Sequence, residues 1–449
     1  MAGGTFIPGV EKVRPGTYIN VKSKKEKKSV TAVKGTTVIP LINHTYGPSG
    51  KFIRLTALEP DMAVAELGYS VSDEKLLLIK EALKGASTVY AYILAGASEK
   101  AKASGGGINA EAKYGGSRGN DFKFSVVADP EAEGAFIIKV YVGATLKASY
   151  EGIKTASDIN ALSDEYIVFT AEEDGKIAEA ASVSLTGGSD KAATNDEYTK
   201  FLDALETVRC NSFAFPVDGE DAEALKKAAR EKAVHLSENC GRRIHAAIPN
   251  YAADCQYIIN VTNGVVLADG TEIDAVKATA WAAAVYAGAT DTKSNTYEPY
   301  PGAVDIIGIK GSDAAIRAIK NGEFFFSFDE EDRVVIEYDI NSLVTLSEGM
   351  DESYKKNRLQ RVIDFLCSDI KIKFPPNKFD NVSEGWDVMD GLGADMLLQK
   401  QDAGALQNVD PATDFLVDRS ASKGDSTLFN VFIQGVDSSE KLYLQIWTN

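Results

Sequence analysis

Apolar residues along this chain recur with two periods, every three or four positions in some segments and every second position in others, which predicts a mixture of helices and strands. Near the start, apolar runs at 36–42 and 88–94 predict two strands, and the pattern at 73–84 predicts a helix between them. This order is typical of a βαβ-like unit. We assign residues 31–96 to the first part of an α/β core.

Residues 97–188 have a different texture, in which short alternating segments are separated by Gly, Asp and Glu turns. Alternation with a period of two is typical of strands that bury one face. The segments are DFKFSVVAD, AFIIKVYVG, EYIVFTAEE and ASVSLTGG. We expect them to form a small antiparallel β-sandwich inserted into the chain.

Helical periodicity returns after the predicted sandwich. Thr194 is expected to cap a helix whose apolar positions follow the i, i+3, i+4, i+7 spacing, at Tyr198, Phe201, Leu202 and Leu205. Further helices are predicted at 219–239, 271–287 and 313–320, with short apolar runs between them at 212–216, 243–248 and 255–261. Residues 189–345 therefore predict an α/β core domain, which a hairpin at 323–340 completes.

The last third of the chain predicts a C-terminal α+β assembly domain at 346–437. A helix at 351–374 is expected to end at Pro375-Pro376, and a second helix follows Ser383 and ends near Gly404. The first helix carries one apolar stripe, made of Leu359, Val362, Ile363, Leu366 and Ile370. Two closing strands are predicted at 429–434 and 442–448.

Both ends of the chain are predicted to be extended arms, at 1–30 and 438–449. The N-terminal arm has one strand-like run, 17–21, which is too little apolar surface for a core of its own. In the C-terminal arm, alternate residues point to opposite faces, and both faces are apolar or aromatic, although chain ends are normally polar. The fold class is thus multidomain α+β and α/β, with extended terminal strands.

Composition narrows the possible partners. The length of 449 residues predicts roughly three domains, and the 48 basic against 65 acidic side chains leave a net charge of −17. Such a field repels nucleic acid and anionic membranes, so we expect neither as a partner. Neither a membrane span nor a signal-peptide pattern is present in the sequence, and the four scattered cysteines predict reduced thiols.

Residues that could carry chemistry are few. The best metal-binding set is His235, Cys240, His245 and Cys255, but its gaps of five, five and ten residues match no zinc-site spacing. A hydrolase would need one of only three histidines, and none lies in a recognisable nucleophile context. Glycine clusters do not follow a strand and open a helix, as phosphate-binding loops do. We expect no catalytic residue, metal or cofactor.

Several segments are distinctive in their sequence and order: 15–21, 113–126, 183–190, 281–306, 334–345, 355–366 and 429–448. In this order they resemble contractile tail sheath proteins of myophages and phage-like bacteriocins, particularly those of Gram-positive bacteria. The matching segments cover nearly the whole chain. One departure is 381–393, where the family more often has a glycine–lysine turn followed by asparagine.

The resemblance implies a structural subunit that stacks in hexameric rings around an inner tail tube and contracts to drive the tube through a target cell envelope. It implies as partners other copies of this chain, the tube protein, and baseplate and tail-terminator proteins. It also implies assembly in the host bacterial cytoplasm, followed by residence in a phage tail or a released bacteriocin. Terminal strands would add to neighbouring subunits through Tyr18, Ile19, Val21, Leu442, Tyr443, Leu444, Ile446 and Trp447.

Two other functions remain compatible with the sequence. A non-contractile surface or shell protein would share the acidic, strand-rich composition and the apolar chain ends. A hydrolase that pairs a serine or cysteine with His245 is the third reading.

Overall fold

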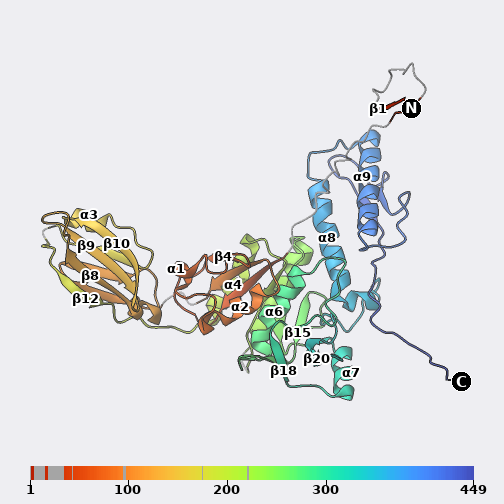
Figure 1. Cartoon of the computed structure of the whole chain (residues 1–449). Coiled ribbons are helices and arrows are strands. Elements are labelled where there is room, and N and C mark those ends of the chain that lie inside the picture. Colours follow the sequence, from red (N-terminus) through yellow and green to blue (C-terminus); the bar gives the residue numbers. More distant parts are fainter. Residues whose placement is uncertain are drawn as a thin grey trace.

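The computed structural model describes residues 2–4, 16–18, 35–42, 44–94, 98–173, 175–219 and 222–448. Among these residues the chain forms an elongated molecule (Figure 1). The β-sandwich lies at one end, an α/β domain lies in the middle, and the helices of the C-terminal domain lie at the other end. The multidomain α/β fold with an inserted sandwich that the sequence predicts is confirmed.

The middle domain is built on one seven-stranded sheet in which all neighbours are parallel except β4 and β5. Strand β3 pairs with β13, so the two stretches of chain on either side of the sandwich form one sheet. In spatial order the strands are β19 (Glu323–Phe324), β15 (Ile258–Val261), β14 (His245–Pro249), β13 (Ser212–Ala214), β3 (Thr36–Leu41), β5 (Thr88–Ile93) and β4 (Phe52–Thr56).

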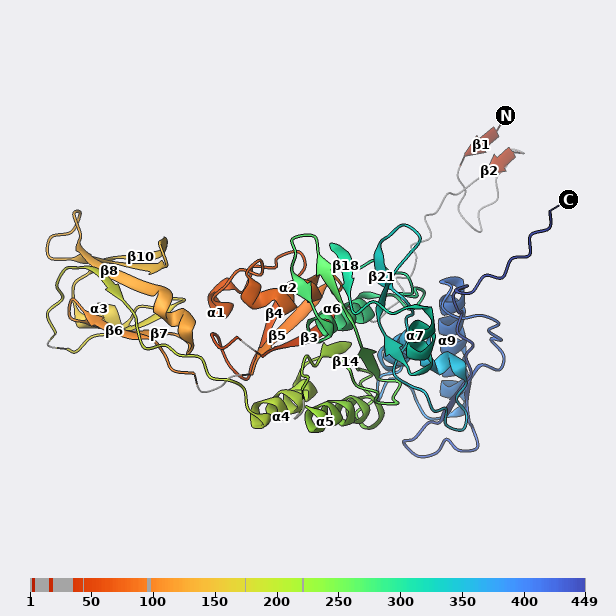
Figure 2. The same cartoon turned by 90° about the horizontal axis from the view of Figure 1, so that it is seen from below.

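Helices cover both faces of this sheet (Figure 2). On one face α2 (Leu77–Leu83) packs against α6 (Ala275–Gly288), an alanine-rich helix that is buried along most of its length. On the other face lie α4 (Asn195–Ala204), which Thr194 caps as predicted, and α5 (Glu223–Val234). The remaining elements of the middle domain are α1 (Val64–Leu67), α7 (Ser312–Lys320), β16 (Gly264–Leu267), β17 (Glu272–Ile273), β18 (Ala303–Ile307), β20 (Phe326–Phe328) and β21 (Val334–Ile336).

The sandwich consists of two antiparallel sheets that enclose aromatic and aliphatic side chains such as Phe122, Phe124 and Phe169. One sheet has the order β10-β9-β8-β12 and the other β11-β7-β6. Their bounds are β6 (Lys102–Gly105), β7 (Ile108–Ala112), β8 (Phe122–Ala128), β9 (Phe136–Val142), β10 (Thr145–Ile153), β11 (Ile167–Thr170) and β12 (Ala180–Ser184), with α3 (Ala156–Asn160) between β10 and β11.

The C-terminal domain pairs two helices with a two-stranded antiparallel sheet. The helices are α8 (Asn357–Lys373) and α9 (Ser383–Asp402), and the strands are β22 (Phe415–Val417) and β23 (Phe429–Val431). The α9 helix packs closely on β22 because Gly393 has no side chain: a Cβ there would lie 2.0 Å from Cδ1 of Phe415. The apolar cluster is small, so other contacts must orient this domain.

One predicted element is divided in the structure, and one strand of the structure is absent from the sequence predictions. The run at 323–340 forms the hairpin β20–β21, but its first two residues join the central sheet as β19. Strand β4 was not predicted. The segment 442–448 pairs with no described strand of its own chain, and its predicted pairing with a neighbouring subunit stays a prediction. Each difference concerns pairing between distant segments, which local periodicity does not encode.

An aromatic plug, Tyr46, joins the sandwich to the middle domain. This residue belongs to the connection between β3 and β4, yet its ring lies in the sandwich core, 5.4 Å from Tyr114 and 5.5 Å from Phe122. Beside it, Asp190 accepts hydrogen bonds from the hydroxyl of Thr45 and from the backbone N–H (2.7 Å) of Ser117. The sandwich is therefore held by packing as well as by its two chain connections.

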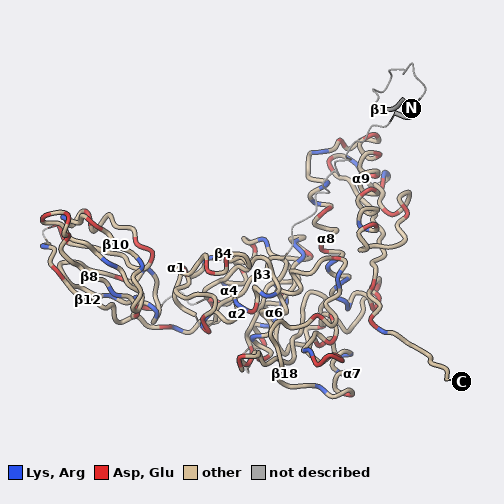
Figure 3. The backbone as a smooth tube through the Cα atoms, in the orientation of Figure 1, with Lys and Arg blue, Asp and Glu red and all other residues tan. Residues whose placement is uncertain are grey.

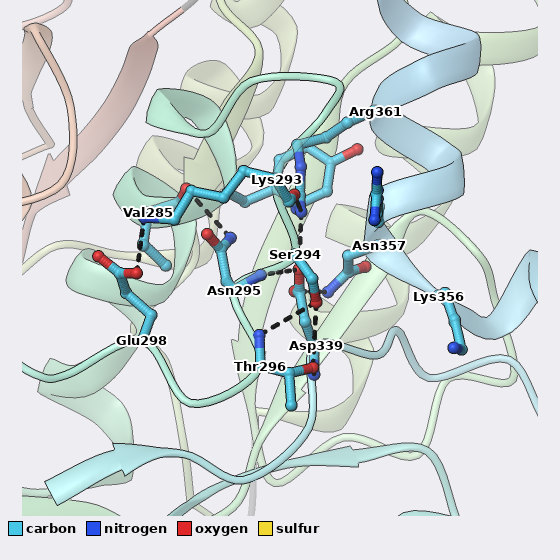
Figure 4. Close-up of polar contacts among 12 residues, drawn as sticks. Val285, Lys293, Ser294, Asn295, Thr296, Glu298, Asp339, Lys356, Asn357 and Arg361 are labelled. Atoms are coloured by element: carbon cyan, nitrogen blue, oxygen red, sulfur yellow. Dashed lines mark hydrogen bonds and ion pairs between the residues drawn. The ribbon is translucent and has the colours of Figure 1, made fainter. Parts of the chain in front are cut away.

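A buried polar junction joins the middle and C-terminal domains (Figure 4). The carboxylate of Asp339, 4% exposed, accepts hydrogen bonds from Asn295 N (2.9 Å), Asn357 Nδ2 (2.9 Å) and Arg361 Nη2 (2.7 Å). Arg361 is itself 2% exposed. Two donors to Asp339 lie on α8, so one carboxylate ties that helix to the loop after α6.

A second buried carboxylate, Asp364, extends the junction. It lies 2.9 Å from Arg243 Nε, accepts a hydrogen bond from the Tyr286 hydroxyl (2.9 Å), and lies 3.0 Å from His245 Nε2. Burial lowers the pKa of His245, although the neighbouring Asp364 opposes the shift. The polar side chains of α8 that contact the middle domain are thus buried as well, because they are paired with that domain. The sequence predicts only the apolar stripe of this helix.

We predict that Tyr46→Ala lowers the stability of the sandwich by about 3–5 kcal/mol, because it empties an aromatic site in the core. Calorimetry should show the loss as a lower melting temperature. Tyr46→Phe is the control and should cost almost nothing, since the Tyr46 hydroxyl has no hydrogen-bond partner among the described residues. Equal losses in the two variants would contradict the plug.

The stability of the chain should depend on pH through His44. This residue is 4% exposed, and burial lowers its pKa to about 4. Because the unfolded state binds this proton near pH 6.5 and the folded state does not, stability falls as pH drops from 6.5 towards 4, by on the order of 3 kcal/mol. His44→Gln should remove that part of the slope. The check is denaturant unfolding of both proteins at several pH values; unchanged slopes would refute it.

We also predict that Asp339→Ala destabilises the chain by about 3–5 kcal/mol, because it leaves the Arg361 guanidinium buried without its carboxylate. Asp395→Ala is the matched control, since Asp395 is an exposed aspartate on α9. Urea unfolding of both variants measures the difference. Similar midpoints for the two variants would show that the junction is not what orients α8.

Candidate functional site

The C-terminal arm, residues 437–448, leaves the folded domains and runs out without forming a helix or strand (Figures 1 and 2). Five large side chains in its outer part are exposed by 73% to 90%: Leu442, Tyr443, Leu444, Ile446 and Trp447. Figure 3 shows this stretch in the tan of uncharged residues. Exposed apolar groups that gather on an extended segment are typical of interaction surfaces.

The root of the arm, in contrast, is attached to the body. Glu440 Oε2 lies 2.8 Å from Lys356 Nζ, and its other oxygen accepts hydrogen bonds from the hydroxyls of Ser294 (2.7 Å) and Thr296 (2.9 Å). Burial alone would lower the pKa of Lys356, but the hydrogen bonds to Asp437 and Glu440 raise it. The boundary between anchored and free chain therefore lies at Glu440.

The sheet formed by β22 and β23 offers a surface that another strand can join. Among the described residues it has two strands, and such a sheet is marginally stable without further pairing. Leu416, Leu428 and Phe432 in or beside it are exposed by 36%, 49% and 63%. Open strand edges next to exposed apolar groups are typical of strand addition.

The predicted N-terminal contacts are described only in part. Tyr18 is the last residue of β2 (Gly16–Tyr18), which pairs in parallel with β1 (Ala2–Gly4). Ile19 and Val21 lie outside the described residues.

The candidate metal ligands do not form a site in the described part of the chain. Cys240 Sγ lies 3.5 Å from His235 Nε2 at the π-helical turn that follows α5. His245 is fully buried in β14, and Cys255 is buried as well. Among the described residues, no group of three or more His, Cys, Asp or Glu side chains suits a metal ion. Because His245 is inaccessible, it can reach no substrate; its contacts belong to the domain junction.

A groove of about 910 Å³ lies at the carboxyl ends of β3 and β13. The strand order reverses between these two strands, and α/β sheets often bind ligands at such a point. The charged residues around it are mainly acidic: Asp73, Glu74, Asp218, Asp269, Glu272 and Asp274, against Lys75, Lys80 and Lys277. This charge disfavours nucleotides and other anionic ligands. No described helix is both long and apolar enough to cross a membrane.

Comparison with known families matches four successive parts of the chain. Residues 34–94 match the tail sheath protein Gp18 domain III N-terminal region, and 95–190 match the phage tail sheath protein beta-sandwich domain. Residues 191–342 match the phage tail sheath protein central domain, and 350–448 match the phage tail sheath C-terminal domain. The last match includes the exposed arm.

Individual proteins give the same result. The phage-like element PBSX protein XkdK of Bacillus subtilis is 32% identical over 475 residues, covering 100% of both chains. The crystal structure of a sheath tail protein from Desulfitobacterium hafniense aligns with a TM-score of 0.81 at 32% identity, covering 96% of this chain and 99% of that one. The helical sheath of the anti-feeding prophage in its contracted state shares the fold, with a TM-score of 0.51 at 11% identity over 98% of this chain and 100% of the other. This chain therefore belongs to the phage tail sheath protein family and is a structural subunit of a contractile sheath.

Proposed function

We propose that this chain polymerises as stacked hexameric rings around an inner tail tube and that neighbouring subunits are linked by exchanged terminal strands. Contraction of this lattice then drives the tube through a target cell envelope. The observation that carries the proposal is the C-terminal arm, whose two faces are apolar and exposed at the end of an otherwise folded chain. Membership of the sheath family favours this function over a non-contractile shell.

The energetics of the arm support pairing between subunits. Burial of Leu442, Leu444 and Ile446 would stabilise by about 1.5–3 kcal/mol each. Ordering the seven residues 442–448 costs on the order of 7–14 kcal/mol of backbone entropy. Apolar burial therefore does not order the arm by itself. Ladder hydrogen bonds, at about 1 kcal/mol each, and a partner that covers the second face supply the difference.

The proposed acceptor for an arm is the β22–β23 sheet of a neighbouring subunit. An added strand extends a marginal two-stranded sheet and covers exposed groups such as Phe432. The N-terminal arm, through Tyr18, Ile19 and Val21, is proposed to add to the same kind of edge. If each of the two arms pairs with a different neighbour, the arms would link subunits within one ring and between adjacent rings.

The remaining proposed partners are those that the resemblance to sheath proteins implies. The inner tube, the baseplate and a tail-terminator protein would bound the sheath on its inside and at its two ends. The acidic chain is proposed to contact neither nucleic acid nor membrane. Assembly is proposed to take place in the cytoplasm of the host bacterium.

We predict that deletion of Leu442–Asn449 leaves folded subunits that do not form sheaths, because the exchanged strand is lost while the body keeps all its contacts. Electron microscopy of the purified protein, with unfolding curves as the check on folding, measures both properties. Gln445→Ala is the control, since it keeps the length and the apolar positions of the arm, and it should assemble. Long tubes from the truncated protein would refute strand exchange by this arm.

A further inference from the structure

The short segment between the folded C-terminal domain and the free arm, residues 437–440, is fastened to the middle domain. We propose that Lys356 and Glu440 form a clasp that fixes the root of the arm to its own subunit and thereby sets how much chain is free to reach a neighbour. The second part of this inference rests on the proposed strand exchange. The first part, the fastening, concerns one chain alone.

The exposure of the side chains changes sharply at the clasp. The Glu440 side chain is 9% exposed, whereas Leu442, two residues further on, is 73% exposed. Both carboxylate oxygens of Glu440 are occupied, one by Lys356 and the other by the hydroxyls of Ser294 and Thr296. A carboxylate with a cation and two hydroxyl donors is held more firmly than an exposed ion pair.

Two further contacts strengthen the fastening. Lys356 also pairs with Asp437, so one ammonium group holds both ends of the four-residue segment. Arg358 Nη1 donates a hydrogen bond of 2.6 Å to the hydroxyl of Ser438, which lies between them. The segment lines a pocket of about 600 Å³, to which Tyr338 also contributes. Hydrogen bonds and ion pairs, rather than close apolar packing, therefore hold the segment in place.

The clasp is built on the buried junction described above. Thr296 Oγ1, which donates to Glu440, also accepts a hydrogen bond of 3.1 Å from the backbone N–H of Asp339. The neighbouring Asn295 donates its backbone N–H to the Asp339 carboxylate. The loop 294–296 therefore contacts the arm root on one side and the domain junction on the other. A force applied to the arm would therefore be transmitted through this loop to the folded domains and would not simply detach the segment.

The clasp determines the reach of the arm. With the clasp closed, the free part of the described chain is 441–448, eight residues that span at most about 26 Å. If all contacts of 437–440 are released, including the hydrogen bond from Arg358 to Ser438, the next attachment is the hydrogen bond from Val436 N to Ala405 O. Residues 437–448 are then free and span at most about 40 Å. Four extra residues would thus add about 13 Å to the tether between neighbouring subunits.

Proteolysis of unassembled, full-length subunits tests the fastening. A glutamate-specific protease should cut slowly after Glu440 in the wild type, and mass spectrometry follows release of the peptide 441–449. Lys356→Met removes the cation and should speed this cleavage at least tenfold. Ser294→Ala, which removes one hydroxyl donor, should speed it to a smaller extent. Cleavage after the exposed Glu348 serves as the internal reference.

Lys355→Met is the matched control. Lys355 is the adjacent lysine and is also ion-paired, 3.0 Å from Glu352, but it does not pair with the arm. Its cleavage rate after Glu440 should equal that of the wild type. Equal rates in wild type, Lys356→Met and Ser294→Ala, all with wild-type unfolding curves, would overturn the clasp. Because no assembly is involved, failure of strand exchange would leave this result unchanged.

Sheath geometry tests the role in setting the tether. Inserting Gly-Ser-Gly between Lys441 and Leu442 lengthens the free arm by about 10 Å with the clasp intact. If the clasp sets the reach, this insertion and Lys356→Met should shift or broaden the ring-to-ring rise in the same direction, as seen by electron microscopy. Lys355→Met should not. Wild-type spacing in Lys356→Met sheaths would overturn the role in length.

Discussion

The carboxylate of Asp339 is the constraint on which the arrangement of the domains depends. A buried charge is costly, so it is tolerated only where donors surround it in fixed directions. Here those donors come from the loop after α6 and from α8, and Arg361 supplies the opposite charge. Since hydrogen bonds are directional and apolar contacts are not, this junction fixes the angle of α8 against the central sheet. The position of the arm root follows from that angle.

The two domain connections use different physics. At the sandwich, Tyr46 fills an apolar site, and packing of this kind tolerates small changes in orientation. At the other end, Asp339 and Asp364 are each held by donors from more than one element, and a shift would leave a buried group unpaired. The polar junction therefore restricts orientation more than the Tyr46 contact does. It lies near the C-terminal arm, where subunits are proposed to meet.

Much of the fold follows from the sequence because it depends on local pattern. The alternation in 97–188 predicts the sandwich, and Thr194 with its following apolar spacing predicts α4. The sequence predicts the apolar stripe of α8 but not the burial of Arg361 and Asp364, because the partners of these two residues lie far away in the chain. Strand β4 and the split run at 323–340 were missed or mistaken for the same reason. They are defined by the strands with which they pair.

The same distinction between local pattern and distant contacts applies to the C-terminal arm. The apolar faces of 442–448 are visible in the sequence, since they contradict the polar composition expected of a chain end. The attachment of the arm is not visible, because Lys356 and Glu440 are 84 positions apart and each is an ordinary charged residue in its own surroundings. A lattice that changes shape while its subunits stay linked needs both parts: an arm with no structure of its own, and a fixed point from which its length is measured. A short run of residues is enough to specify the unstructured arm. The fixed point forms only when the domains have folded against each other.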